Sequence, residues 1–558
     1  MNSSSVGKYI PAHRVSWLNT TYHAFRNFLT SSNLAGLMCV VIALFLLLVP
    51  PLPWNIRLAL YLVVFVWTIL RPRVALYLMP ICVPWGSLDF IDIKGLRLNS
   101  ADVLVIFLAI GWLLSFVLHQ KVGPQDREAS HIPTYLVIAM LALVGTMVLS
   151  MTVALNINSS LKEISKWLEF LVLMLLGAQY LRTRRQIWTI IVIVCLAGIS
   201  QAFYGYFQAF FNLGPQSFIR DASLRVYGTF DQPNPYAGYI NIPLSIALSL
   251  TLLGRGRLTR ILAGLTTLLL VIAEYLTQSR GGEIAIAAAL LFIVLAGMPR
   301  IRVLMRVLII LLLGPLEALI AGWIPLYIFN PLLHFLGLVQ ISLSTPSSQD
   351  FSTAERVAHW LAGLHMFIDH PVLGVGIGNY PDAYPKYFIT IFTDPLGHAH
   401  NYYINIAAET GSIGLIVFLL FLFTIFVAGG HSLLQISKKW RQAKAQKPQV
   451  QPIIQAPLGR RNKLALLLRP LSLIQHYEAQ EQSEIFGMLT NDKALAIGIL
   501  AALITVCVHN LVDDLFVHSL TNLIALLLIA LIRLERVTPD TSDYGIGIGG
   551  QFAYTEHW

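Results

Sequence analysis

Residues 134–153 read TYLVIAMLALVGTMVLSMTV, an apolar block without a single charged side chain. A helix rises about 1.5 Å per residue, so a block of this length can span the roughly 30 Å of hydrocarbon in a bilayer. Other apolar blocks recur along the chain, and none shows the strict alternation of membrane β-strands. The sequence therefore predicts an all-α, polytopic helical membrane protein.

Apolar blocks lie on both sides of this one. They make about 12–14 candidate transmembrane helices, because the block at 74–85 is short and contains Pro80 and Pro84, which leaves a re-entrant or broken segment as the alternative there. The candidates lie near residues 34–50, 55–70, 74–85, 101–118, 134–153, 165–181, 187–211, 236–253, 258–277, 283–297, 303–328, 402–428, 494–511 and 517–533.

The composition also indicates a membrane protein. The 558 residues are 56% hydrophobic and only 12% charged, which is too apolar for one soluble core to bury. The four cysteines lie inside apolar blocks without the spacing of a metal site, so we interpret them as packing residues. The formal charge of +10 raises the question of nucleic acid, but most of the 38 Lys and Arg residues fall in alternate connections, which is typical of the cytoplasmic side of a membrane.

This charge pattern predicts an inner or plasma membrane protein with both termini in the cytoplasm. No small-residue cleavage site follows the first span, so we expect it to stay attached. The basic inner connection is expected to be partly disordered and to rest near anionic lipid. The predicted organisation is a cytoplasmic segment at 1–33, a transmembrane region at 34–328, an external loop domain at 329–401, a transmembrane helix at 402–428, the cytoplasmic basic loop at 429–493, a transmembrane hairpin at 494–533 and a flexible cytoplasmic tail at 534–558.

Polar clusters on the predicted external side are the candidates for function, because charges at a membrane edge are costly. They contain Arg225, Arg280, Arg356, and His398 with His400. An arginine fork binds phosphate oxygens bidentately and stays charged, so several arginines on one face favour a metal-free diphosphate site. For each arginine taken alone, a snorkelling or capping role is the alternative.

Arg280 lies in a Ser-Arg-Gly-Gly turn between two apolar blocks. Gly281 and Gly282 would let backbone amides approach an anion closely. Pairing with Glu274 or Glu283 at the membrane edge is the alternative.

His400 immediately precedes the block at 402–428. Helical periodicity would place His400 and Gly411 on one face, where Gly411 and Gly414 would let a neighbouring helix pack beneath the histidine. A histidine of near-neutral pKa is suited to take a proton from an acceptor hydroxyl. A histidine that only caps the helix is the alternative.

The string His400-Asn401, nine residues, then Gly411-Ser-Ile-Gly414 resembles the H-[NSQ]-x9-G-x-x-[GTY] pattern of the O-antigen ligase family. The segments ERVAHW, TQSRGG and RVYGTFDQPNPYAGY, which contain Arg356, Arg280 and Arg225, are similar to further segments of that family. The resemblance covers roughly residues 200–425, whereas the long inner loop and the additional spans depart from a simple ligase.

This resemblance implies a membrane glycosyltransferase similar to the GT-C type. Such an enzyme transfers a preassembled glycan from undecaprenyl diphosphate to a glycolipid, glycan or protein acceptor on the external face, with inversion and without metal or other cofactor. It belongs to polysaccharide or lipopolysaccharide biosynthesis in the cell envelope. The resemblance assigns catalytic roles to His400, Arg280 and Arg356, and substrate binding to Arg225, Asn401 and His398.

Three other functions remain open. Polymerisation would extend a glycan on its own carrier, and a related domain also occurs in a membrane protein associated with bicarbonate uptake, although no inverted repeat indicates transport here. A non-catalytic scaffold would leave the external arginines unexplained. Metal chemistry would need the carboxylate pairs Asp89 with Asp92 or Asp513 with Asp514, which we interpret as a loop and a turn.

Overall fold

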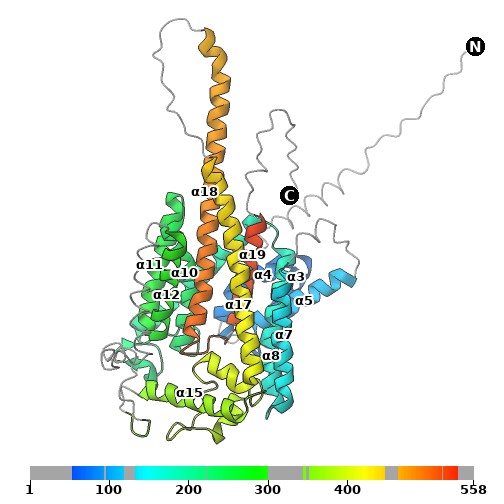
Figure 1. The fold of residues 1–558 in the computed structure, drawn as a ribbon, viewed down its shortest axis with the longest axis vertical. Helices are drawn as coiled ribbons and strands as arrows, with labels where there is room; N and C mark the ends of the chain where they lie inside the picture. The colour runs from blue at the N-terminus through cyan, green and yellow to red at the C-terminus, as the bar shows by residue number, and fades with distance from the viewer. Residues whose placement is uncertain are drawn as a thin grey trace, which may run out of the picture.

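Long helices run side by side through most of the molecule in a computed structural model of the chain (Figure 1). The structure describes residues 53–88, 90–93, 96–117, 132–220, 223–298, 343–346, 351–446, 463–517 and 519–537. The predicted spans at 34–50 and 303–328 and the predicted cytoplasmic segment at 1–33 lie outside the described residues, as does most of the predicted tail.

The described helices follow the apolar blocks of the sequence. Seven of them are long and apolar enough to cross a membrane, so the all-α polytopic fold is confirmed. Two short antiparallel hairpins pair β1 (Phe90–Ile93) with β2 (Leu96–Asn99) and β3 (Ile219–Arg220) with β4 (Ser223–Leu224). The helices are α3 (Trp54–Leu70), α4 (Arg73–Trp85), α5 (Ser100–Val117), α7 (Thr134–Ser150), α8 (Ile157–Tyr180), α9 (Arg184–Phe211), α10 (Pro233–Leu253), α11 (Arg257–Thr277), α12 (Arg280–Gly297), α15 (Phe351–Asp369), α16 (Tyr380–Ala383), α17 (Tyr402–Ala445), α18 (Lys463–His509) and α19 (Leu520–Val537).

The proline-containing block forms a single short helix. α4 has 13 residues, so it is about 20 Å long and shorter than the hydrocarbon thickness. Both Pro80 and Pro84 lie inside it, and nearly all of its side chains are buried. The Thr229 hydroxyl donates to the Pro84 carbonyl, which shows how a neighbouring segment supports this helix end.

α10 and α18 form the centre of the bundle. In each, 78% of the most apolar window is buried, compared with 22% for α11 and α12. Small residues allow this close contact: a side chain at Gly498 of α18 would meet the Ile246 backbone of α10. The packing of α10 against α18 therefore fixes the positions of the loops at their ends relative to each other.

Helix replaces much of the predicted inner loop. α17 continues to Ala445 and α18 already begins at Lys463, so the expectation of a partly disordered loop at 429–493 is wrong for 429–445 and 463–493. The polar stretch is rich in Lys, Arg, Gln and Ala, which are good helix formers. The two helices also brace each other, because the Trp440 indole donates to the Thr490 hydroxyl at 3.0 Å.

α15 lies across one end of the bundle, in the region predicted as an external loop domain (Figure 1). The segment that follows α15 packs against the first turns of α17. Val375 N donates to Ala408 O at 2.9 Å, Gly376 N donates to Glu409 O at 3.0 Å, and Ser412 N donates to Pro371 O at 2.8 Å. In a regular helix, the carbonyls of Ala408 and Glu409 and the amide of Ser412 would form hydrogen bonds within α17.

Gly411 interrupts α17 and makes this contact possible. Its φ of 65° and ψ of −165° are not helical, and a side chain there would meet the Val372 backbone. The prediction that His400 and Gly411 share one helical face is therefore wrong, because His400 precedes the helix and Gly411 breaks it. Gly411 instead allows the loop after α15 to pack closely against α17.

We expect Gly411→Ala to destabilise the protein by about 2 kcal/mol or more, because alanine disfavours this backbone conformation and meets the chain at Val372. Thermal unfolding in detergent measures the effect. Gly430→Ala is the matched control in the same helix, since a side chain at Gly430 meets nothing within 4 Å and should leave the Tm unchanged or raise it. Equal Tm values for the two variants would contradict this role of Gly411.

Candidate functional site

The histidine motif forms a tight loop that ends at the start of α17. His400 adopts a left-handed backbone conformation with a φ of 51°, and its carbonyl accepts a hydrogen bond from the Trp360 indole at 3.0 Å. Asn401 is the N-cap of α17, because its side-chain oxygen accepts from Tyr403 N at 3.0 Å and from Ile404 N at 3.1 Å. The loop thus holds the histidine at a fixed position at the helix entrance.

A second loop joins α18 to α19 and lies directly against the first. The Asn401 carboxamide donates to Leu511 O at 2.8 Å, and Tyr402 N donates to Asn510 O at 2.9 Å. On the other side, the Lys166 ammonium of α8 donates to Phe516 O at 3.0 Å. Both flanks of the α18–α19 loop are therefore fixed by hydrogen bonds to its carbonyls.

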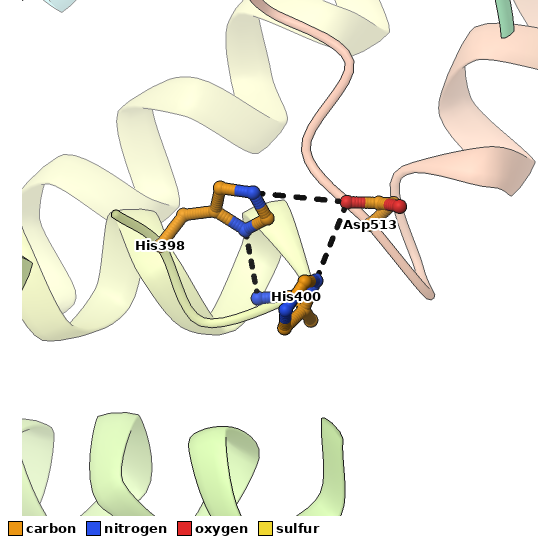
Figure 2. Close-up of side chains that lie close together, drawn as sticks. All are labelled: His398, His400 and Asp513. Carbon is orange, nitrogen blue, oxygen red and sulfur yellow. Dashed lines mark hydrogen bonds and ion pairs between the residues drawn. The ribbon is translucent and has the colours of Figure 1, made fainter. Parts of the chain in front are cut away.

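These two loops bring Asp513 to the histidines (Figure 2). His400 Nδ1 lies 3.5 Å from Asp513 Oδ1, and His398 Nε2 lies 3.8 Å from the same oxygen. Asp513 is 1% exposed and His400 is 8% exposed, so the pair lies almost out of solvent. Since Nδ1 faces the carboxylate, Nε2 is the nitrogen of His400 that points away from it.

Burial and contact set the charges of this pair. Burial is the largest influence on His400 and lowers its pKa below the usual value, while contact with Asp513 partly offsets that effect. Burial alone would raise the pKa of the Asp513 carboxyl, but the contact with His400 and the positive charge of Arg356 lower it below its usual range. The pair is therefore a neutral imidazole beside an ionised carboxylate at neutral pH.

His398, His400 and Asp513 also have the spacing of a candidate metal site, since one ligand atom of each lies within 4.8 Å of the others. A histidine that binds a metal normally donates its second ring N–H to an acceptor. His398 Nδ1 instead accepts from the backbone N–H of His400 at 3.0 Å. In a neutral ring the proton is then on Nε2, the nitrogen that faces Asp513, so this nitrogen has no lone pair to offer a metal.

A third histidine supports His400 from α15. The edge of the His359 ring meets His400, with centroids 5.5 Å apart, and its face stacks on Tyr384 at 4.6 Å. Its Nδ1 lies 3.1 Å from the Tyr380 hydroxyl. Burial lowers the pKa of His359 to about 4, so it is a neutral packing partner at physiological pH.

The structure brings two of the predicted arginine segments together. Arg225 Nε donates to Thr277 O at 3.0 Å and its NH2 donates to the Asn234 side-chain oxygen at 3.1 Å. The same Asn234 oxygen accepts from the Ser279 hydroxyl at 3.1 Å. Ser279 is the N-cap of α12, and Arg280 is the first residue of that helix. The arginine pair thus flanks a helix N-terminus, which favours anions.

His509 joins this arginine turn to the histidine loop. It is the last residue of α18, and a side chain at Gly281 would lie 3.0 Å from its ring. Asp513 follows in the next turn of chain, and the positive charge of Arg356 in α15 acts on both His400 and Asp513. His509 and Asp513 therefore link the Arg280 turn to His400 at this end of the bundle.

The predicted site residues thus have different roles in the structure. His400, His398, Arg280, Arg225 and Arg356 lie at one end, whereas both ends of the Asn401 side chain are used to cap α17 and to hold the Asp513 loop. Reasoning from the sequence missed Asp513 and His509, which it interpreted as parts of a turn and a span. The pair of adjacent acids in HNLVDDLF, at a connection on the predicted external side, was the available signal.

The comparison with protein families agrees with this geometry. Residues 265–419 match the family model described as O-antigen ligase. That range contains the Arg280 turn, Arg356 of α15, and the motif from His400 to Gly414, while Arg225 and Asp513 lie outside it. A search of curated proteins found no match to the chain.

The domain, the motif and the membrane helices describe one kind of protein. The domain at residues 265–419 is assigned to the O-antigen ligase family, and together with the seven long apolar helices among the described residues it indicates a multi-pass membrane enzyme of the ligase or polymerase type.

Proposed function

We propose that the chain transfers a preassembled glycan from undecaprenyl diphosphate to an acceptor hydroxyl, at the end of the bundle where α15 lies. The contact between His400 and Asp513 carries this proposal, because a buried, ionised carboxylate beside Nδ1 holds the imidazole with its proton on that nitrogen. The other nitrogen, Nε2, is then an acceptor. This is the protonation state that a general base requires.

In the reaction, Nε2 of His400 takes the proton of the acceptor hydroxyl as its oxygen attacks the anomeric carbon of the donor glycan. The bond from that carbon to the diphosphate oxygen breaks, and the undecaprenyl diphosphate leaves with the electron pair. Attack opposite to the leaving group inverts the anomeric configuration. Asp513 stabilises the imidazolium that forms, as a carboxylate does for a catalytic histidine.

The leaving diphosphate gains charge, and the arginines supply the opposite charge. Arg280 and Arg225 flank the N-terminus of α12, and Arg356 lies on α15 near the histidine pair. Fixed donors aimed at a developing anion commonly contribute the largest share of rate enhancement. This division gives His400 the acceptor and the arginines the donor.

The acceptor distinguishes two members of the superfamily. A ligase places one glycan block on a glycolipid, protein or other polymer, whereas a polymerase extends the glycan on its carrier. We favour ligation because the sequence from His400 to Gly414 resembles the ligase motif. The size distribution of the product, a single block or a ladder, separates the two.

We expect His400→Ala to lose transfer by about 10²-fold or more, because the Asp513 carboxylate, whose pKa is lowered, is too weak a base to replace the imidazole. The measurement is transfer of labelled glycan from undecaprenyl diphosphate by purified protein in detergent, with chelator present. His431→Ala is the control, since that histidine is exposed on α17 beyond the kink. Transfer that survives in His400→Ala, with the protein folded, would overturn the assignment.

The pH profile tests Asp513. His400 must be neutral to act, so activity should be full above its lowered pKa and should fall as the pH drops through a midpoint below the ordinary histidine value of about 6.5. In Asp513→Asn we expect a lower kcat and a midpoint at still lower pH, because the carboxylate favours the protonated ring.

The exposed carboxylate Asp382 supplies the matched control for that experiment. Asp382→Asn should keep the wild-type midpoint. If Asp513→Asn lowers kcat without moving the midpoint, Asp513 acts on the fold alone and not on the imidazole.

We expect Arg280→Lys to reduce transfer by about 10-fold or more, because a point charge cannot replace a fork that binds two phosphate oxygens. The same transfer assay measures it, at saturating acceptor and varied donor. Arg257→Lys, an exposed position at the start of α11, is the control. Unchanged activity of Arg280→Lys would remove Arg280 from the diphosphate site.

A further inference from the structure

A cavity of about 530 Å³ lies among α10, α12, α17 and α18, at the end of the bundle away from His400. Its walls are mostly apolar and include Leu253, Ala296, Leu434 and Ile497. Leu434 is 64% exposed, so one wall continues onto the outer surface of the helices. Leu434 belongs to α17, which is one of the helices long and apolar enough to cross a membrane.

One edge of the same cavity is basic. Arg441 of α17 and Lys493 of α18 both line it, and Arg441 is exposed. Trp440 directly precedes Arg441 in α17 and contacts Lys493: the Lys493 ammonium lies 4.1 Å from the centre of the Trp440 ring, and the indole donates to Thr490. The Trp440 ring thus holds Lys493 at this edge, and the exposed Arg441 lies beside it with its Nε donating to Ser437 O at 3.3 Å.

Further cations surround this edge. The Lys444 ammonium lies 5.2 Å from the centre of the Trp440 ring. Trp440 stacks on Phe486, and the Arg255 guanidinium lies 4.9 Å from the centre of the Phe486 ring. The positive-inside tendency assigns this end to the cytoplasmic leaflet, which is rich in anionic lipid. A cavity with apolar walls and a cationic edge at that depth matches one chemical class.

We propose that this cavity binds an anionic membrane phospholipid, with an acyl chain along the apolar walls and the phosphate at Arg441 and Lys493. A free phosphate would use the basic edge but would leave the apolar walls in water, so the walls favour the lipid. The bound lipid connects the α17–α18 pair to α10 and α12. This site is independent of glycan transfer and has no contact with the His400 loop.

Thermal unfolding of the purified protein in detergent micelles tests the proposal. Dioleoylphosphatidylglycerol should raise the Tm in a saturable way by about 2 °C or more, because a ligand that binds only the folded state stabilises it. Dioleoylphosphatidylcholine and inorganic phosphate should not. The double variant Arg441→Gln/Lys493→Gln should lose the shift, whereas Arg257→Gln, a surface cation at the same end outside the cavity, should keep it.

A second measurement uses the wild-type protein and does not depend on the stability of any variant. A phosphatidylglycerol with a photoreactive acyl chain should attach to peptides that contain residues 433–441 and 490–497. Adducts only elsewhere would overturn the proposal, as would an equal Tm shift with phosphatidylcholine or with phosphate alone. Absence of both the Tm shift and the adducts would likewise overturn the proposal.

Discussion

Two hydrogen bonds between neighbouring loops hold the candidate site together. Asn401 donates from its side chain to Leu511 O, and Tyr402 donates from its backbone to Asn510 O. They join the start of α17 to the end of α18, and they bring His400 to Asp513, although more than a hundred residues separate the two in sequence. Without this junction the histidine would have no carboxylate to orient it. Asn401 therefore positions His400 and Asp513 by joining their two loops.

The junction can be rigid because the helices below it are. α10 and the Gln482–His509 part of α18 are mostly buried in their apolar windows and approach closely at Gly498, which restricts movement of one helix against the other. Gly411 adds a second constraint, because its backbone conformation opens α17 to the loop that follows α15. The glycine of the motif thus connects the end cap to the bundle. The segment from His400 to Gly414 therefore holds one histidine in a fixed position.

Charge is divided between the two ends of the bundle. One end combines His400, Asp513 and arginines near a helix N-terminus, which suits a reaction that releases a diphosphate. The other end is basic through residues such as Arg184, whose guanidinium binds the fully buried Asp492 at 2.8 Å. The first arrangement suits the proposed chemistry, whereas Arg441 and Lys493 at the second end line the cavity proposed to bind lipid.

The sequence by itself determined the membrane-spanning character and the positions of most helices, and it singled out the motif that begins at His400. Each of these depends on local features: the length of an apolar block, the alternation of basic loops and a short motif. It failed where distant segments meet. Helical periodicity placed Gly411 on the face of His400, since the sequence cannot show that a glycine leaves the helix to admit another loop. Only the tertiary structure decided that Asp513 orients the histidine and that Asn401 ties the two loops together, because both roles depend on contacts between α17 and the α18–α19 connection that no spacing along the chain encodes.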